Sequence, residues 1–111
     1  MARPTCLLLV DSDPERQHLV RRAMRRRGDL VLTAASAAEA LSRLEQCAIP
    51  IDWVVIDTSA DDAAGARSLA AEIAARNSQI GILLSVESPF DCEYRLLLKP
   101  YAARDLYATL G

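Results

Sequence analysis

The sequence contains no apolar run long enough to cross a membrane, no internal repeat and no low-complexity tract. Its first four residues lead directly into an apolar segment and do not form a signal peptide. The three cysteines, Cys6, Cys47 and Cys92, are an odd number without metal-ligand spacing, which favours reduced thiols over a disulfide framework. We therefore expect a cytoplasmic protein.

A strong charge of one sign is also missing, because the chain of 111 residues has a formal net charge of -2. Five arginines lie between positions 21 and 27, but nucleic-acid binding usually adds aromatic side chains or further basic elements. We interpret this cluster as a solvated helix face, and we expect neither a nucleic acid nor a membrane as a partner. The apolar fraction of 51% and charged fraction of 25% are typical of a globular protein, here one domain covering residues 1–111.

Two apolar runs end abruptly in carboxylates. Residues 53–56 lead into Asp57, and residues 6–10 lead into Asp11 and Asp13. Continuous apolar runs of this length are typical of strands that are buried on both faces of a parallel sheet. Ligands bind at the carboxyl ends of strands in open α/β sheets, so these acids are well placed to hold a hard cation.

Strands alternate with helices along the whole chain. We expect strands at residues 6–10, 30–34, 53–57, 80–84 and 94–98, and helices at 14–27, 36–46, 66–76 and 102–110. Asp13 and Ser36 are the expected N-terminal caps of the first two helices, and Gly28 is expected to end the first. One face of the first helix is expected to be buried through Leu19, Val20, Ala23 and Met24. The alternation predicts an α/β fold with a doubly wound, five-stranded parallel sheet.

One crossover is too short for this pattern. Only eight residues, 86–93, separate Ser85 from Tyr94. A parallel crossover normally takes about a dozen residues or more and carries a helix. We therefore expect the helix between the fourth and fifth strands to be absent, reduced to a loop or a single turn.

The strand ends carry Asp11, Asp57, Ser85 and Lys99-Pro100 in this order. With this set in register, nearly the whole chain resembles the receiver domain of bacterial two-component response regulators, the CheY-like flavodoxin-like fold. The resemblance implies that Asp57 accepts a phosphoryl group from a histidine kinase or a histidine phosphotransfer protein. It also implies that the Ser85 hydroxyl binds the new phosphoryl group and that Lys99 pairs with it.

The resemblance further implies a Mg²⁺ ion held by Asp11, Asp57 and the backbone carbonyl of Ser59, with Asp13 as a further candidate ligand. The family places a second acid directly after the first strand, at the position where this chain has Ser12. Because serine carries no charge, we expect the magnesium site to be weak.

Three functions stay open. The first is a stand-alone receiver, complete in this chain, that is phosphorylated on Asp57 and signals by binding a protein that the sequence does not identify. The second is a degenerate receiver that binds a partner without phosphate. It is favoured by Ser12, by the short crossover, by Val86 in place of a very small residue, and by Leu96 in place of the family's mobile aromatic residue. The third is an enzyme, because the apolar strand before Asp11 and Asp13 also resembles the haloacid-dehalogenase phosphatase signature, although that family needs a longer chain. We expect a signalling protein and no enzyme.

Overall fold

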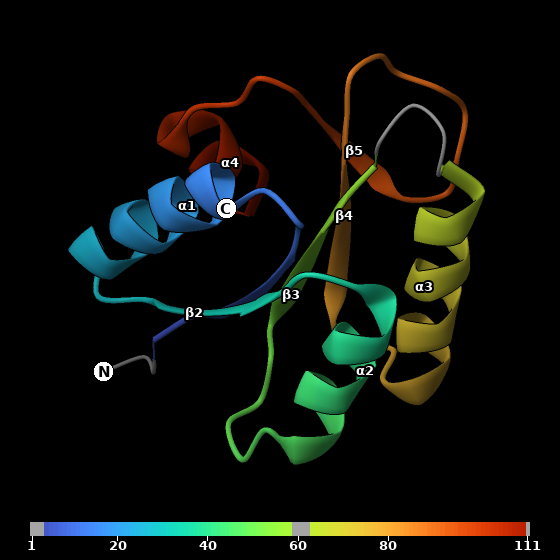
Figure 1. Ribbon diagram of the computed structural model, residues 1–111, viewed down its shortest axis with the longest axis horizontal. Coiled ribbons are helices and arrows are strands. Elements are labelled where there is room, and N and C mark those ends of the chain that lie inside the picture. Colours follow the sequence, from blue (N-terminus) through green and yellow to red (C-terminus); the bar gives the residue numbers. More distant parts are fainter. Residues whose placement is uncertain (1–3, 59–62, 111) are drawn as a thin grey trace.

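The computed structural model describes residues 4–58 and 63–110, which form one parallel sheet and four helices (Figure 1). In chain order the elements are β1 (Cys6–Val10), α1 (Pro14–Arg26), β2 (Leu30–Ala34), α2 (Ala37–Gln46), β3 (Trp53–Asp57), α3 (Ala63–Arg76), β4 (Gly81–Val86), β5 (Arg95–Leu98) and α4 (Ala103–Leu110). The strand order is β2-β1-β3-β4-β5, and every neighbouring pair is parallel. The predicted doubly wound, five-stranded fold is confirmed.

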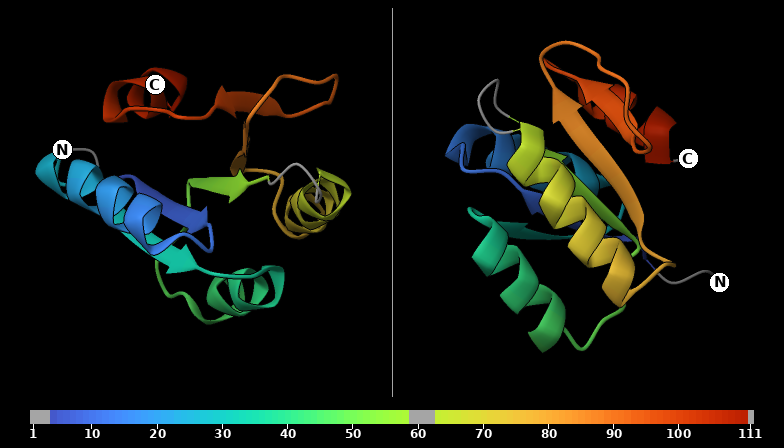
Figure 2. Two further views of the ribbon diagram at one scale, coloured as in Figure 1. Left: turned by 45° about the horizontal axis from the view of Figure 1, so that its top comes forward. Right: turned by 90° about the vertical axis from the view of Figure 1, so that its right-hand side faces the viewer.

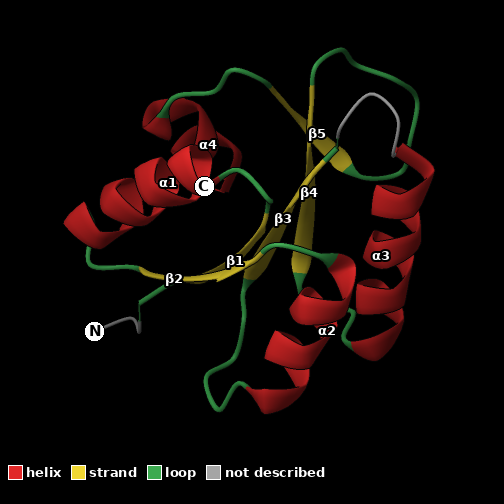
Figure 3. Cartoon of the chain, viewed as in Figure 1, coloured by secondary structure: helices red, strands yellow, loops and turns green. Residues whose placement is uncertain are grey.

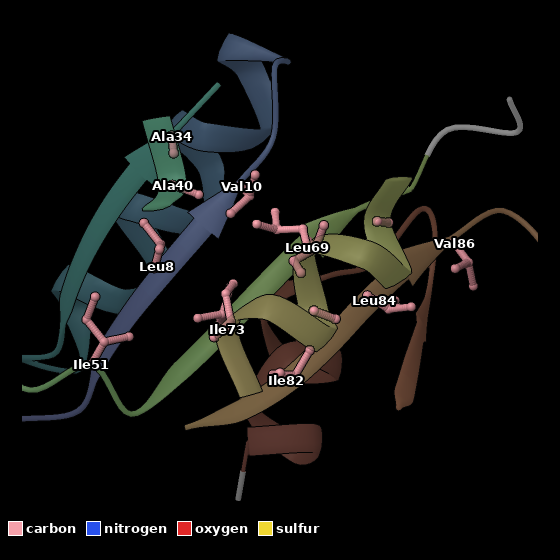
Figure 4. Packing of buried hydrophobic residues seen from close by; sticks show 14 of the residues in the cluster. Leu8, Val10, Ala34, Ala40, Ile51, Leu69, Ile73, Ile82, Leu84 and Val86 are labelled. Atoms are coloured by element: carbon pink, nitrogen blue, oxygen red, sulfur yellow. The ribbon is translucent and has the colours of Figure 1, made fainter. Parts of the chain in front are cut away.

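Helices cover both faces of the sheet (Figures 1 and 2), with α1 and α4 on one face and α2 and α3 on the other. Side chains alternate between the two faces along each strand, so each strand feeds two cores. On β1, Leu7 and Leu9 pack toward α1 and α4, whereas Leu8 and Val10 join the core beneath α2 and α3 (Figure 4). The central strands are therefore apolar at successive positions because both of their faces are buried.

Local side-chain bonds fix the helix ends where the sequence predicts them. The Asp13 carboxylate accepts from the Glu15 N–H at 3.0 Å, and the Ser36 hydroxyl accepts from the Glu39 N–H at 3.1 Å. Gly28 follows α1 with φ of +80°, a conformation that suits glycine at the end of a helix. Loops and turns connect the helices and strands (Figure 3). No helix among the described residues is both long and apolar enough for a membrane span.

The prediction that Leu19 is buried is wrong, because its side chain is 62% exposed. Val20 and Met24 lie one turn apart and face the sheet, with 5% and 0% of their surface exposed. Leu19 is displaced by about 100° around the helix from Val20, which carries it past the edge of the buried stripe.

The segment between β4 and β5 contains no helix, as predicted from its length. β5 nevertheless pairs in parallel with β4, from Leu83 opposite Arg95 to Val86 opposite Leu98. The connecting loop contributes Phe90, Cys92 and Tyr94 to the core on the side of α3. The loop therefore covers part of the sheet that a helix covers elsewhere.

The fourth strand also runs further than predicted, to Val86, so Ser85 lies inside it.

Candidate functional site

The sheet register brings the predicted site residues to one edge. Asp57 is the last residue of β3 and pairs with Ser85 of β4, and the Thr58 N–H donates to the Ser85 carbonyl at 2.8 Å. Asp11 directly follows β1, the other neighbour of β3. A hollow of about 170 Å³ at this edge is lined by Asp11, Ser12, Asp57 and residues that begin α2 and α3. We call this edge the acidic pocket, and we include in the name the side chains that are ion-paired with Asp11 or Asp57 and their further partner Asp13, namely Arg16, Lys99 and Asp13.

Asp57 is the centre of a polar cluster. Its Oδ1 accepts from the Lys99 ammonium at 2.7 Å and from the Ser85 hydroxyl at 3.2 Å. The Lys99 ammonium also donates to the Thr58 carbonyl at 3.2 Å, so two acceptors fix its position. The side chains of Lys99 and Asp57 are only 11% and 14% exposed, and Ser85 is fully buried. The structure thus brings together the three residues to which the resemblance gives the phosphoryl chemistry.

Asp11 is paired with an arginine from the first turns of α1. The Arg16 Nε donates to Asp11 Oδ2 at 2.6 Å and its Nη2 donates to Asp11 Oδ1 at 3.2 Å, which forms a two-pronged ion pair. The Asp13 N–H donates to Asp11 Oδ1 at 2.8 Å. Because Asp11 is only 2% exposed, its charge needs such partners.

Arg16 also reaches the other two carboxylates of the pocket. Its Nη1 lies 3.3 Å from Asp13 Oδ2, and its Nη2 lies 3.6 Å from Asp57 Oδ2. The hydrogen bond with Asp11, opposed in part by burial and supported by the charges of all three acids, raises the pKa of Arg16 above its ordinary value. Arg16 is therefore a fixed cation between three carboxylates.

The sequence predicts no role for Arg16, although it belongs to the run Val10-Asp11-x-Asp-Pro-x-Arg16 that contributes to the resemblance. The available signal was its spacing, because residues three apart on a helix lie on neighbouring turns and Asp13 precedes Arg16 by three. That signal is weak here, since α1 and its end carry five more arginines. Asp13 caps α1, as predicted, and also pairs with Arg16.

The Tyr101 hydroxyl lies near the pocket and is buried without a hydrogen-bond partner among the described residues. Burial, followed by the charges of Asp11 and Asp57, raises the pKa of Tyr101 to about 12, and Arg16 partly opposes the shift. The same environment that stabilises cations here therefore disfavours a phenolate.

The donors present do not fit the Mg²⁺ ion that the resemblance implies. Magnesium needs open oxygen ligands in near-octahedral geometry, but both Asp11 oxygens are occupied by Arg16. Ser12 is exposed and adds no charge. Within residues 4–58 and 63–110, no three His, Cys, Asp or Glu side chains are grouped to hold a metal ion. The Ser59 carbonyl, the third predicted ligand, lies outside the described residues.

No family model matches the chain, and no curated protein matches it in sequence. Solved structures do match it. The chemotaxis response regulator CheY4 of Vibrio cholerae superposes with a TM-score of 0.83 at 19% identity, covering 97% of each chain. A response regulator from Thermotoga maritima gives 0.80 at 18% identity, covering 97% of this chain and 95% of its own. The signal receiver domain of an HD domain-containing protein from Pseudomonas fluorescens Pf-5 gives 0.78 at 22% identity, covering 97% and 92%. The chain has the fold of CheY-like response-regulator receiver domains.

Proposed function

We propose that the chain is a response-regulator receiver whose Asp57 accepts a phosphoryl group from a histidine kinase or a histidine phosphotransfer protein. It then signals by binding a protein partner. The observation that carries the proposal is the contact of Asp57 Oδ1 with the Lys99 ammonium at 2.7 Å and with the Ser85 hydroxyl, at the carboxyl edge of a receiver fold.

The two oxygens of Asp57 have different surroundings. Oδ1 accepts from Lys99 and Ser85, whereas Oδ2 faces Arg16 at 3.6 Å, beyond the usual hydrogen-bond distance. Oδ2 is therefore the oxygen with a lone pair free to attack phosphorus. Phosphoryl transfer depends mainly on positioning and on neutralising the transferred oxygens, which the Lys99 and Arg16 cations supply.

The transfer balances without a further reactant. A lone pair of Asp57 Oδ2 forms the new O–P bond while the P–N bond of the phosphohistidine breaks. The bonding pair stays on the ring nitrogen, and the imidazole leaves as a neutral ring when its other nitrogen carries a proton. The products are an acyl phosphate on Asp57 and an unmodified histidine.

The test uses a small acyl-phosphate donor, and then histidine kinases from the source genome, with phosphorylation read from the intact mass. We expect the wild-type chain to gain one phosphoryl group and the Asp57→Asn variant to gain none. Asp91→Asn, a change at an exposed loop acid, is the matched control and should behave as the wild type. Phosphoryl gain by Asp57→Asn would remove the assignment of the acceptor.

A second candidate is a receiver that binds its partner without phosphate. It is favoured by Arg16, which already neutralises the pocket around Asp57 in the unphosphorylated chain. In this case Asp57→Asn binds the partner as well as the wild type does, whereas the first candidate predicts that phosphorylation changes the affinity.

The phosphatase alternative finds less support in the geometry. It needs Asp11 as the attacking carboxylate. Both Asp11 oxygens are hydrogen-bonded to Arg16, and one also accepts from the Asp13 N–H. A carboxylate saturated in this way is a poor nucleophile.

A further inference from the structure

Arg16 occupies the position where the three carboxylates of the acidic pocket converge. It extends from the first turns of α1, and its guanidinium contacts Asp11, Asp13 and Asp57 at 2.6, 3.3 and 3.6 Å. These acids come from two different strand ends and one helix cap. A single planar cation therefore connects three carboxylates from separate parts of the chain.

The contacts with Asp11 explain why this cation stays in place. A forked pair between a guanidinium and a carboxylate uses two parallel N–H donors, which fixes both partners. Asp11 is almost fully buried, so a departing Arg16 would leave a buried charge without its main partner. An incoming divalent ion must displace this pair before it can bind Asp11.

Position 12 adds to the effect. A second carboxylate there would supply charge and ligands for a divalent ion in addition to those that Arg16 neutralises. The chain has an exposed serine instead. Arg16 and Lys99 thus supply two positive charges against three carboxylates, and one net negative charge remains for any further cation.

We infer that Arg16 takes the place of the divalent cation in this pocket, so that the site works without a metal and the guanidinium receives the oxygens of a phosphoryl group on Asp57. The phosphoryl part rests on the proposed function, whereas the replacement of the cation does not. A group attached at Asp57 Oδ2 lies against Arg16 Nη2, which is 3.6 Å from that oxygen.

The first experiment measures thermal unfolding of the metal-free chain at rising Mg²⁺ and constant ionic strength. The variants are Arg16→Met and, as matched control, Arg22→Met, which removes an exposed arginine from the same helix. We expect the melting temperatures of the wild type and of Arg22→Met to be insensitive to Mg²⁺. Arg16→Met should melt lower without metal and recover with it, with Mg²⁺ affinity about tenfold or more above that of the wild type.

Equal responses of the wild type and Arg16→Met to Mg²⁺, or no response in either, would overturn the inference. If Arg16→Met folds only when Mg²⁺ is added, that rescue supports it. If the variant does not fold even then, Arg16→Lys decides, because lysine keeps the charge but cannot form the fork. A Mg²⁺ response of Arg16→Lys above the wild type supports the inference, and a response equal to the wild type overturns it.

The second experiment separates this inference from the proposed function. With acetyl phosphate as donor, Asp57 forms an O–P bond as the P–O bond to acetate breaks, and acetate leaves with the bonding pair. We expect the wild type to be phosphorylated equally with EDTA and with Mg²⁺, and Arg16→Met to require Mg²⁺. A wild type that requires Mg²⁺ overturns the inference but keeps the proposed function. If no phosphoryl group is gained under any condition, the proposed function fails, and the melting experiment still decides whether Arg16 replaces the cation.

Discussion

Removing Lys99 should destabilise the chain far more than removing its partner Asp57. Lys99→Met leaves the carboxylates of Asp11, Asp13 and Asp57 with Arg16 as the cation among them. Asp57→Asn instead leaves two carboxylates with two cations. The asymmetry follows from the count of charges around the pocket and not from the strength of one bond.

The geometry sets the magnitude of the loss. Unit charges 2.7 Å apart attract by about 6 kcal/mol at an effective dielectric constant near 20, and the cost of desolvating both groups offsets part of this. Breaking a buried pair by removing one partner typically costs about 3–5 kcal/mol. Asp57 keeps the Ser85 hydroxyl and its contact with Arg16, so we expect a loss of about 3 kcal/mol for Lys99→Met. Asp57→Asn should cost less, about 1 kcal/mol, because Lys99 keeps its hydrogen bond to the Thr58 carbonyl and the repulsion among the three carboxylates falls.

The assay is urea unfolding followed by fluorescence of Trp53, the single tryptophan, at the start of β3. The double variant completes a mutant cycle and should be more stable than Lys99→Met alone. The control Arg22→Met should leave the free energy of unfolding within about 0.5 kcal/mol of the wild type. If Asp57→Asn is as destabilising as Lys99→Met, the charge count does not govern the stability of the pocket.

Two further predictions concern the sheet and the pH response. Gly81→Ala should lower the free energy of unfolding by about 2–3 kcal/mol in the same urea assay, because an added Cβ would meet the Trp53 ring across the β3–β4 pairing. An unchanged urea midpoint would show that the Trp53 ring can move away from the added Cβ. The pKa of Tyr101 is raised to about 12 in the folded chain, whereas the ordinary tyrosine pKa is near 10. The protonated hydroxyl therefore contributes fully to stability below pH 10, and this contribution is lost as the pH rises from 10 toward 12, because the unfolded chain ionises first. Ultraviolet titration should show a late tyrosine ionisation toward pH 12, and Tyr101→Phe should remove that step. A titration curve that Tyr101→Phe leaves unchanged would contradict the burial argument.

The fold was largely predictable because its information is local. The runs 6–10, 30–34 and 53–57 are strands in the structure with the predicted bounds. The fourth strand was ended too early, because Ser85 is polar and its burial depends on a bond to Asp57, which lies 28 residues earlier in the chain. Leu19 was misplaced for a related reason, since periodicity locates the centre of a buried stripe better than its edge.

The site was predictable to a lesser degree. Strand ends converge by topology, so Asp11, Asp57, Ser85 and Lys99 could be brought to one edge from their order alone. The partner of Asp11 could not be found in this way, because a long arginine on α1 can face either solvent or the pocket. Whether Arg16 faces solvent or the pocket depends on the burial of Asp11, and only the assembled sheet determines that burial.

The missing helix between β4 and β5 leaves this site intact for a structural reason. Lys99 is positioned by the end of β5, where its N–H donates to the Val86 carbonyl at 2.8 Å, one residue beyond Ser85. The register from Leu83 to Val86 therefore places both Ser85 and Lys99, whatever connects the two strands. The loop needs only to cover the sheet, which Phe90, Cys92 and Tyr94 help to do on the side of α3. Because the pocket is built from strand ends and from Arg16 on α1, shortening this crossover removes a surface of the domain without removing a group from the pocket.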